Sequence, residues 1–340
     1  MRKTPDQGTE NKARIEEFRF RHLDPNIFIG TASDRYAGWI GQIYTQKRYA
    51  GRISSRSNKV GGKTFQEEVL PVESVEEYFE HFPVLEIDYT FYSPLLEKDG
   101  RPSKNFHVLK TYAQHMTEND RVVLKVPQVI SAQKIRRSGK YIENETYLDP
   151  EIFTKRFYEP ANEILGPSLT GFIFEQEYQR KQDRTPAAQM GQELDRFFAS
   201  IPQDTRYHIE LRTEACLSSP VFEILEKHGV GQVLSHWTWL PSLKKQIAKA
   251  DGKIFNSGRQ RIVRLMTPRG TRYEEAYAKA HPFDKLVDGM LQAGMVKDSA
   301  ELMKKALQED VKTSVLINNR AGGNAPLIAR RIAEEYSQDS

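Results

Sequence analysis

The chain has 340 residues, of which 38% are hydrophobic and 28% are charged, enough for one large domain or two small ones. Its mean hydropathy is −0.64, and no stretch approaches the roughly 18 apolar residues of a membrane span, so we predict no membrane association. The net charge of +4 is too small to indicate nucleic-acid binding by itself, and a single cysteine, Cys216, excludes an internal disulfide.

Residues 1–24 are rich in charge and lack the apolar core of a signal peptide. We therefore expect a flexible N-terminal arm, a cytoplasmic protein and a folded domain over 25–340. The segment 42–66 is rich in glycine and arginine and has little apolar periodicity, which indicates a functional loop, with a lid as one reading. Basic side chains gather in this segment and in a second one, namely Lys47, Arg48, Arg52, Arg56, Lys59 and Lys63, then Lys134, Arg136, Arg137 and Lys140. Such runs are usually solvated surface, but beside a ligand site they would favour an anionic substrate.

Outside the segment 42–66, the apolar residues follow the periods of strands and helices, which alternate along the chain. The expected strands are 27–29, 84–91, 122–126, 169–174, 207–211, 231–234, 262–265 and 314–317. The expected helices are 75–82, 103–115, 150–165, 187–200 and 220–228, with more within 283–308 and a last one after 326. Eight short strands separated by helices predict an α/β fold, a single (β/α)8 TIM-type barrel of parallel strands with long βα loops.

Several of these strands alternate apolar with charged residues, although a barrel strand buried on both faces should be almost continuously apolar. In the strand 84–91, Glu86 and Asp88 share one face while Leu85, Ile87 and Phe91 share the other. We expect the apolar faces of these strands to pack on the helices and the charged faces to point into the barrel. An unpaired buried charge costs several kcal/mol, so such groups must pair, be hydrated or line a cavity. The charged residues fall late in their strands, at the carboxyl end where barrel active sites form. They comprise the acids Glu86, Asp88, Glu175 and Glu210 and the bases Lys125, Arg212 and Arg264.

These seven residues suggest a catalytic centre. We predict Glu210 as a general acid or base, with Glu86 or Glu175 as its partner. Lys125 would act as an electrostatic stabiliser or as a Schiff-base nucleophile, and Arg212 and Arg264 would clamp a carboxylate or phosphate. The catalytic prediction comprises Glu86, Asp88, Lys125, Glu175 and Glu210. The alternative is a buried salt-bridge layer that only fixes strand register.

The last strand, 314–317, leads into a glycine turn and a helix that begins near Pro326. Two adjacent glycines permit positive φ and close backbone approach, and free N–H groups and side-chain amides attract anions. We therefore predict that this loop contacts substrate, the alternative being a plain strand-to-helix connection. The predicted contacts are Asn318, Asn319, Gly322, Gly323 and Asn324, together with His236 from an earlier strand end.

The same loop, Asn-Asn-x-Ala-Gly-Gly-Asn-Ala-Pro over 318–326, resembles the C-terminal signature of the YecE-like family, domain-of-unknown-function family seventy-two. Other segments resemble this family in order: Phe28-Ile-Gly-Thr31, Glu86-Ile-Asp-Tyr-Thr-Phe-Tyr92, Lys125-Val-Pro127, Glu210-Leu-Arg212, Leu234-Ser-His-Trp237 and Val263-Arg-Leu265. The resemblance implies a TIM-type barrel and no established activity. Two positions depart from the family pattern, since His236 stands where an acid is usual and Arg320 where a histidine is usual.

Other signals are weaker. His208 and His236 could join the acids around a divalent metal, but no metal-ligand spacing is present, so we assign no metal site. No Walker-A or Gly-x-Gly-x-x-Gly sequence supports a nucleotide cofactor. Cys216 reads as a packing thiol rather than a nucleophile. Glu175 and Glu210 could form a glycosidase pair, although the seventh strand offers Arg264 instead of an acid.

Three functions remain in competition. The first is an enzyme, an isomerase, lyase or hydrolase, that uses acid–base chemistry on a small anionic metabolite such as a phosphorylated or carboxylated sugar. The second is a nucleic-acid-binding or nucleic-acid-processing protein that uses the basic loops. The third is a non-catalytic scaffold for a small ligand. Fold alone does not choose among them, and the sequence does not indicate an oligomeric state.

Overall fold

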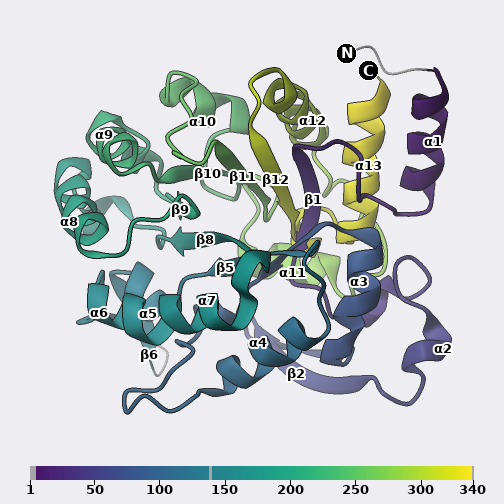
Figure 1. Cartoon of the computed structure of the whole chain (residues 1–340), viewed down its shortest axis with the longest axis horizontal. Helices are drawn as coiled ribbons and strands as arrows, with labels where there is room; N and C mark the ends of the chain where they lie inside the picture. Colours follow the sequence, from purple (N-terminus) through teal and green to yellow (C-terminus); the bar gives the residue numbers. More distant parts are fainter. Residues whose placement is uncertain (1–4, 138–139, 339–340) are drawn as a thin grey trace. The chain divides into compact units, whose positions relative to one another are not determined.

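The computed structural model describes residues 5–137 and 140–338. Eight parallel strands form a closed barrel in the order β1-β12-β11-β10-β9-β8-β5-β4 (Figure 1). They are β1 (Ile27–Ala32), β4 (Val84–Ile87), β5 (Arg121–Lys125), β8 (Leu169–Glu175), β9 (Tyr207–Glu210), β10 (Gly231–His236), β11 (Gln260–Leu265) and β12 (Lys312–Ile317). Helices alternate with these strands along the chain. The predicted α/β fold, a TIM-type (β/α)8 barrel, is confirmed.

Two antiparallel hairpins lie outside the barrel sheet: β2 (Ser54–Val60) with β3 (Lys63–Val69), and β6 (Lys134–Arg137) with β7 (Lys140–Glu143). The first hairpin, with the short helix α2 (Gln46–Tyr49), occupies most of the segment 42–66 that was expected to be an irregular loop. Along β2 and β3 only Val60 and Glu67 are buried. A strand that buries so little carries no alternating apolar pattern, so its sequence gave no strand signal.

One strand ends four residues earlier than predicted. The strand expected over 84–91 ends at Ile87, and Tyr89–Phe91 forms a turn of 3-10 helix. The Thr90 hydroxyl donates to the backbone oxygen of Lys125 at 2.7 Å, which holds this turn against the end of β5. Asp88 therefore lies after the strand, and the alternation that placed it on one face with Glu86 does not extend to it.

The chain divides into two compact units by its internal contacts. Unit 1 comprises Met1–Leu85, His236–Thr238 and Val263–Ser340, and unit 2 comprises Glu86–Ser235 and Trp239–Ile262.

Besides α2, the helices of unit 1 are α1 (Pro5–Glu16), α3 (Val75–His81), α11 (Tyr273–Ala280), α12 (Ala293–Gln308) and α13 (Ala325–Gln338). In Figure 1, α13 runs beside α1, and it also packs against α12 and β1. Ile15, Phe20 and Leu23 are buried. Within the arm expected over 1–24, residues 5–16 thus form α1, whose Ile15 is buried, and the first four residues lie outside the described part of the chain.

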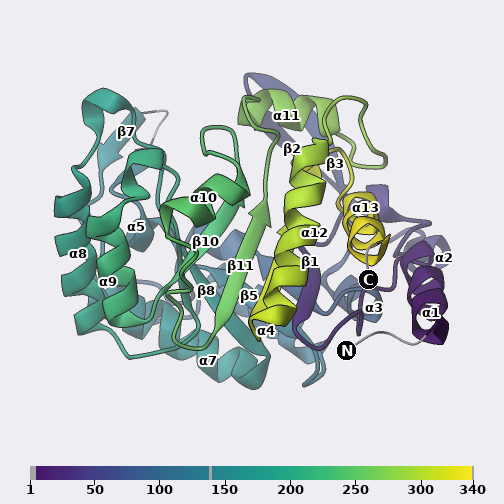
Figure 2. The ribbon, with the colours of Figure 1, turned by 90° about the horizontal axis from the view of Figure 1, so that it is seen from above.

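The helices of unit 2 are α4 (Lys104–Gln114), α5 (Gln128–Ser131), α6 (Pro150–Phe153), α7 (Glu159–Leu165), α8 (Ala187–Ser200), α9 (Ser219–His228) and α10 (Leu243–Lys249). Figures 1 and 2 show α8 and α9 side by side. Phe174 of β8 meets Phe153 of α6 at 5.2 Å and Phe197 of α8 at 5.6 Å between ring centroids. The apolar face of β8 therefore packs on the helices, as its alternation predicted, which leaves Glu175 on the other face.

Among the helices of residues 5–137 and 140–338, none combines the length and hydropathy that a membrane span requires.

Candidate functional site

Three adjacent strands of unit 2 end on a charged residue. Lys125 is the last residue of β5, Glu175 of β8 and Glu210 of β9. Glu175 and Glu210 are direct partners in the parallel register of β8 and β9, and β5 pairs with the other edge of β8. Because carboxyl ends of parallel strands meet at one end of a barrel, these side chains belong to the end where barrel enzymes place their active sites.

These residues and Arg212, two positions beyond the end of β9, form an ion-pair network that we call the Glu175 network: Lys125, Glu175, Glu210 and Arg212. The Lys125 ammonium lies 2.7 Å from Glu175 Oε2. The same oxygen accepts from Arg212 Nη2 at 2.8 Å, while Arg212 Nε lies 3.2 Å from Glu210 Oε2. One carboxylate oxygen thus holds two cations, and one guanidinium joins two carboxylates.

Burial differs within the Glu175 network. Glu210 is fully buried, whereas the Arg212 side chain keeps 16% of its surface exposed and is the most accessible member. Lys125 also lies 3.9 Å from the centroid of the Phe91 ring. Both a carboxylate and an aromatic face attract an ammonium group. The surroundings of Lys125 therefore suit an electrostatic role better than Schiff-base formation.

No pattern in the sequence indicated the Phe91 contact. Phe91 was assigned to the helix-facing set of a strand over 84–91, but the chain turns after Ile87. Glu86 is fully buried in β4 and takes part in polar interactions. Asp88 is only half-buried at the start of the turn, so we do not carry it into the proposed site.

The predicted substrate-binding residues His236 and Arg264 belong to unit 1. His236 Nε2 lies 2.9 Å from Gln292 Oε1, an oxygen that also accepts the backbone N–H of Arg269. Burial lowers the pKa of His236 to about 4, so its imidazole is neutral at pH 7 and offers no positive charge to an anion. Arg264 is fully buried and takes part in polar interactions. Gln292, which fixes the His236 ring, lies far from it in sequence, and no motif indicated it.

The asparagines of the loop after β12 make hydrogen bonds to other groups of the protein. Asn319 Oδ1 accepts from Trp39 Nε1 at 3.1 Å and from the backbone N–H of Ala325 at 2.8 Å. Asn324 Oδ1 caps α13 by accepting the backbone N–H of Leu327 at 2.9 Å. Asn318 Oδ1 accepts the backbone N–H of the residue two positions on, at 3.0 Å.

The glycine pair in this loop also has an internal explanation. Gly323 has φ +113°, and a Cβ there would lie 2.3 Å from the oxygen of Lys285 and 2.9 Å from the nitrogen of Val287. The neighbouring Gly322 accepts the backbone N–H of Val287 at 2.9 Å. The close backbone approach that was expected for a ligand is therefore made by the segment 285–287. The contacts within the protein explain these residue types without a ligand. That the loop binds substrate therefore stays a prediction, made for Asn318, Asn319, Gly322, Gly323 and Asn324.

Cys216 is buried, and burial raises the pKa of its thiol to about 11. A thiol that stays protonated at pH 7 is a poor nucleophile. Within the described ranges, no group of three or more His, Cys, Asp or Glu side chains is arranged to hold a metal ion.

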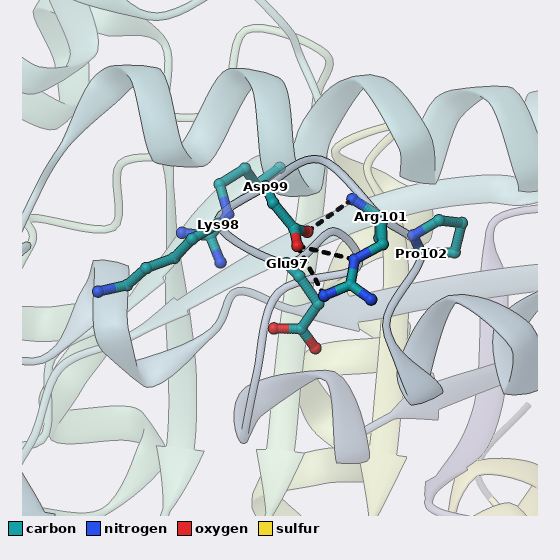
Figure 3. Close-up of a pocket in the computed structure, with 6 residues that line it drawn as sticks. Glu97, Lys98, Asp99, Arg101 and Pro102 are labelled. Carbon is teal, nitrogen blue, oxygen red and sulfur yellow. Dashed lines mark hydrogen bonds and ion pairs between the residues drawn. The ribbon is translucent and has the colours of Figure 1, made fainter.

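A hollow of about 770 Å³ lies on the connection from β4 to α4 (Figure 3). Its lining comprises Glu97, Lys98, Asp99, Arg101, Pro102 and Arg156. Arg101 pairs with Asp99 at 2.7 Å, and Arg156 Nε donates to the backbone oxygen of Leu96 at 3.0 Å. These charged side chains bond to atoms of the same connection, and none of the predicted site residues lines the hollow. We therefore place the candidate site at the Glu175 network.

The parallel barrel and the charged strand ends define a TIM-type barrel protein whose candidate site lies at the carboxyl ends of β5, β8 and β9. The chain matches the family described as "Protein of unknown function DUF72" over residues 28–340, and it belongs to that family. The resemblance seen in the sequence is confirmed.

Two solved structures of this family share the fold. A DUF72 family protein from Thermotoga maritima matches with a TM-score of 0.57 and 15% identity, over 91% of this chain and 98% of that one. A DUF72 family protein from Enterococcus faecalis matches with a TM-score of 0.53 and 16% identity, over 91% of this chain and 95% of that one. No curated protein matches the chain.

His208 in β9, considered above as a metal ligand, should make the stability of the protein depend on pH. It is fully buried, with Nδ1 3.0 Å from the oxygen of Arg206, and burial lowers its pKa to about 4. In the unfolded chain a histidine has a pKa of about 6.5. Between these values the unfolded state binds the extra proton, so the free energy of unfolding should fall as pH drops from about 6.5 to about 4. Denaturant titrations at several pH values measure this slope.

The matched variants for this test are His208→Gln and, at an exposed position, His107→Gln. The first should reduce the slope in that window, where the buried His236 still contributes, and the second should leave the slope unchanged. If His208→Gln keeps the wild-type slope, the proton uptake belongs to other groups.

Proposed function

We propose that the chain is an enzyme that performs acid–base chemistry on a small anionic metabolite, a phosphorylated or carboxylated sugar-like compound, at the carboxyl ends of β5, β8 and β9. The observation that carries this proposal is Arg212, a partly exposed guanidinium that bridges two buried carboxylates. Guanidinium binds carboxylate and phosphate through two parallel hydrogen bonds. Isomerisation, elimination and hydrolysis all use proton transfer of the kind a positioned carboxylate supplies.

The contacts suggest a division of roles. Glu175 holds Lys125 and Arg212 at 2.7 and 2.8 Å, so it is a positioning residue for the two cations. A substrate anion would compete with Glu210 for Arg212, because both offer oxygen atoms to the same fork. Once displaced, the Glu210 carboxylate could accept a proton from the substrate, while Lys125 stabilises negative charge that develops there.

The nucleic-acid alternative has less support. Three of the basic residues near the first hairpin pair with acids: Arg48 with Glu76, Arg52 with Glu73 and Arg56 with Glu67. Paired cations contribute less to binding of a polyanion.

A ligand screen tests the proposal. The panel holds sugar phosphates, sugar carboxylates, divalent metals and short oligonucleotides, and the measurement is the shift in thermal midpoint. A ligand at about 100 times its Kd should stabilise the protein by about 2.7 kcal/mol. Arg212→Met should lose the shift for small anions, and Arg212→Lys, which keeps the charge without the fork, should weaken it. A small-anion shift that Arg212→Met leaves intact would move the site elsewhere.

Glu210→Gln then tests catalysis with any substrate the screen finds. The amide keeps the size of the side chain but cannot take up a proton at neutral pH. We expect kcat to fall by about a hundredfold or more, while the ligand Kd should not rise, because Glu210 no longer competes with the anion for Arg212. Unchanged turnover would remove Glu210 from the chemistry, and binding without any wild-type turnover would favour the non-catalytic scaffold.

A further inference from the structure

The exposed large apolar side chains of the described residues share one topological location. They are Ile53, Tyr92, Tyr141, Ile142, Tyr178, Trp239 and Tyr273. Each lies on the chain between the end of a barrel strand and the helix that leads back to the next strand. In unit 2 this places them at the same barrel end as the Glu175 network. Exposed apolar groups gathered at one functional end indicate a binding surface.

Two of these side chains form a stacked pair in unit 2. The rings of Tyr178 and Trp239 have centroids 5.7 Å apart and planes 29° apart. Tyr178 remains 39% exposed and Trp239 45% exposed, so the pair keeps much of its aromatic surface in solvent. Tyr178 follows Glu175 of the network by three positions. We call this pair the aromatic platform.

The loop that carries Tyr178 is fixed on both sides of it. The backbone N–H of Gln176 donates to the oxygen of Glu210 at 3.0 Å. The backbone N–H of Gln179 donates to Thr213 Oγ1 at 3.0 Å. These bonds tie both flanks of Tyr178 to the end of β9 and the residues after it, so the exposed ring is presented by an ordered backbone.

The turn that carries Trp239 is fixed in a similar way. Gln246, which is fully buried, donates from Nε2 to the oxygens of Ser235 and Pro241, each at 2.8 Å. Leu240, next to Trp239, is also buried. Both rings of the platform therefore stand on fixed backbone, which lowers the entropy cost of binding a ligand against them.

The charge of the surrounding loops helps to select the ligand. The unit 2 connections that follow barrel strands contain ten Lys and Arg and nine Asp and Glu residues, over 88–103, 126–149, 176–186, 211–218 and 239–242. Such a balance lacks the surplus positive charge that a nucleic-acid backbone requires. The negative face of an aromatic ring instead suits the weakly positive C–H face of a sugar ring.

We propose that Tyr178 and Trp239 bind the ring of a hexopyranose that carries one anionic group. The apolar face of the sugar would lie on the aromatic platform, and its phosphate or carboxylate would reach Arg212 in the Glu175 network. This inference rests on the proposed function, because it names the substrate class for that site. It adds a part of the site that recognises the ring rather than the charge.

Calorimetric titration of the full chain tests the inference with defined probes: glucose 6-phosphate, glucuronate, inorganic phosphate and AMP. We expect at least one of the two hexose anions to bind the wild type. Trp239→Ala and Tyr178→Ala should each raise its Kd by about tenfold or more, as expected for loss of a stacking partner. Tyr178→Phe keeps the ring and should stay within about threefold, as should His107→Ala, at an exposed position of α4 outside this set of apolar side chains.

The outcomes separate this inference from the proposed function. Equal hexose-anion binding by wild type and both alanine variants would overturn the platform, while a loss in Arg212→Met would still support the anion site. Binding of inorganic phosphate without any hexose anion would also overturn the platform. If AMP binds and loses affinity in Trp239→Ala while the hexose anions do not bind, the rings stack on a base and the sugar assignment is wrong. The thermal midpoint of each variant serves as the control for its folding.

Discussion

Replacing Glu175 by glutamine is expected to lower the free energy of unfolding by about 3–5 kcal/mol, the usual cost of removing one partner from a buried ion pair. Glu175 Oε2 lies 2.7 Å from the Lys125 ammonium and 2.8 Å from Arg212 Nη2. The side chains of Glu175 and Lys125 are only 6% and 9% exposed, so water replaces little of the lost interaction. The amide keeps the shape but leaves the two cations without their shared charge. Denaturant unfolding at pH 7 measures the difference.

Two controls belong with this measurement. Glu159→Gln removes a carboxylate from Lys155, in a pair whose side chains are 63% and 50% exposed, and should cost at most about 0.5 kcal/mol. Lys125→Met combined with Glu175→Gln removes a cation together with the carboxylate, and should recover part of the loss. A loss below about 1 kcal/mol in Glu175→Gln would mean that solvent reaches the network and screens it.

The same variants address the alternative in which the charges only fix strand register. A purely structural network should respond in stability alone, whereas a catalytic one should also lose more turnover in Glu210→Gln than its loss of stability explains. Active sites often hold charges at the expense of stability. A variant in which apolar residues replace charges of the Glu175 network, and which is more stable than the wild type but inactive, would therefore favour the catalytic hypothesis.

Much of the barrel could be predicted because its strands carry a two-residue period. In β8, Phe172 and Phe174 pack on helices, and the residue after them, Glu175, falls on the opposite face at the strand end. The same reasoning placed Lys125 and Glu210 at neighbouring strand ends, where they join one network. Period and position in the strand are local properties, so one sequence is sufficient to show them.

What could not be predicted depends on contacts between distant parts of the chain. The turn after Ile87 is held by a hydrogen bond from Thr90 to Lys125, and no local pattern marks that bond. The need for Gly323 comes from the segment 285–287, which passes where a side chain would stand. A Gly-Gly pair beside two asparagines looks the same whether a ligand or the protein itself approaches it.

Gly30→Ala is expected to lower the free energy of unfolding by about 3 kcal/mol or more, at the upper end of overpacking effects. Gly30 lies in β1, and a Cβ there would stand 1.9 Å from the backbone oxygen of Val84 in β4. That oxygen accepts from the Tyr78 hydroxyl at 2.8 Å, and the same hydroxyl accepts the backbone N–H of Thr31 at 2.9 Å. The clash therefore meets a backbone that is held by two buried hydrogen bonds and cannot shift without straining them.

Gly294→Ala is the matched control for Gly30→Ala, because both remove a glycine from regular structure. Gly294 is the second residue of α12, and a Cβ there would meet no atom within 4 Å. Alanine reduces the freedom of the unfolded chain, so this variant should be more stable by about 0.5–1 kcal/mol. If the free energy of unfolding falls in Gly30→Ala and rises in Gly294→Ala, the close approach of β1 to β4 is the cause of the loss in Gly30→Ala. A Gly30→Ala protein of wild-type stability would mean that these two strands separate easily, and the barrel could not then depend on their close contact.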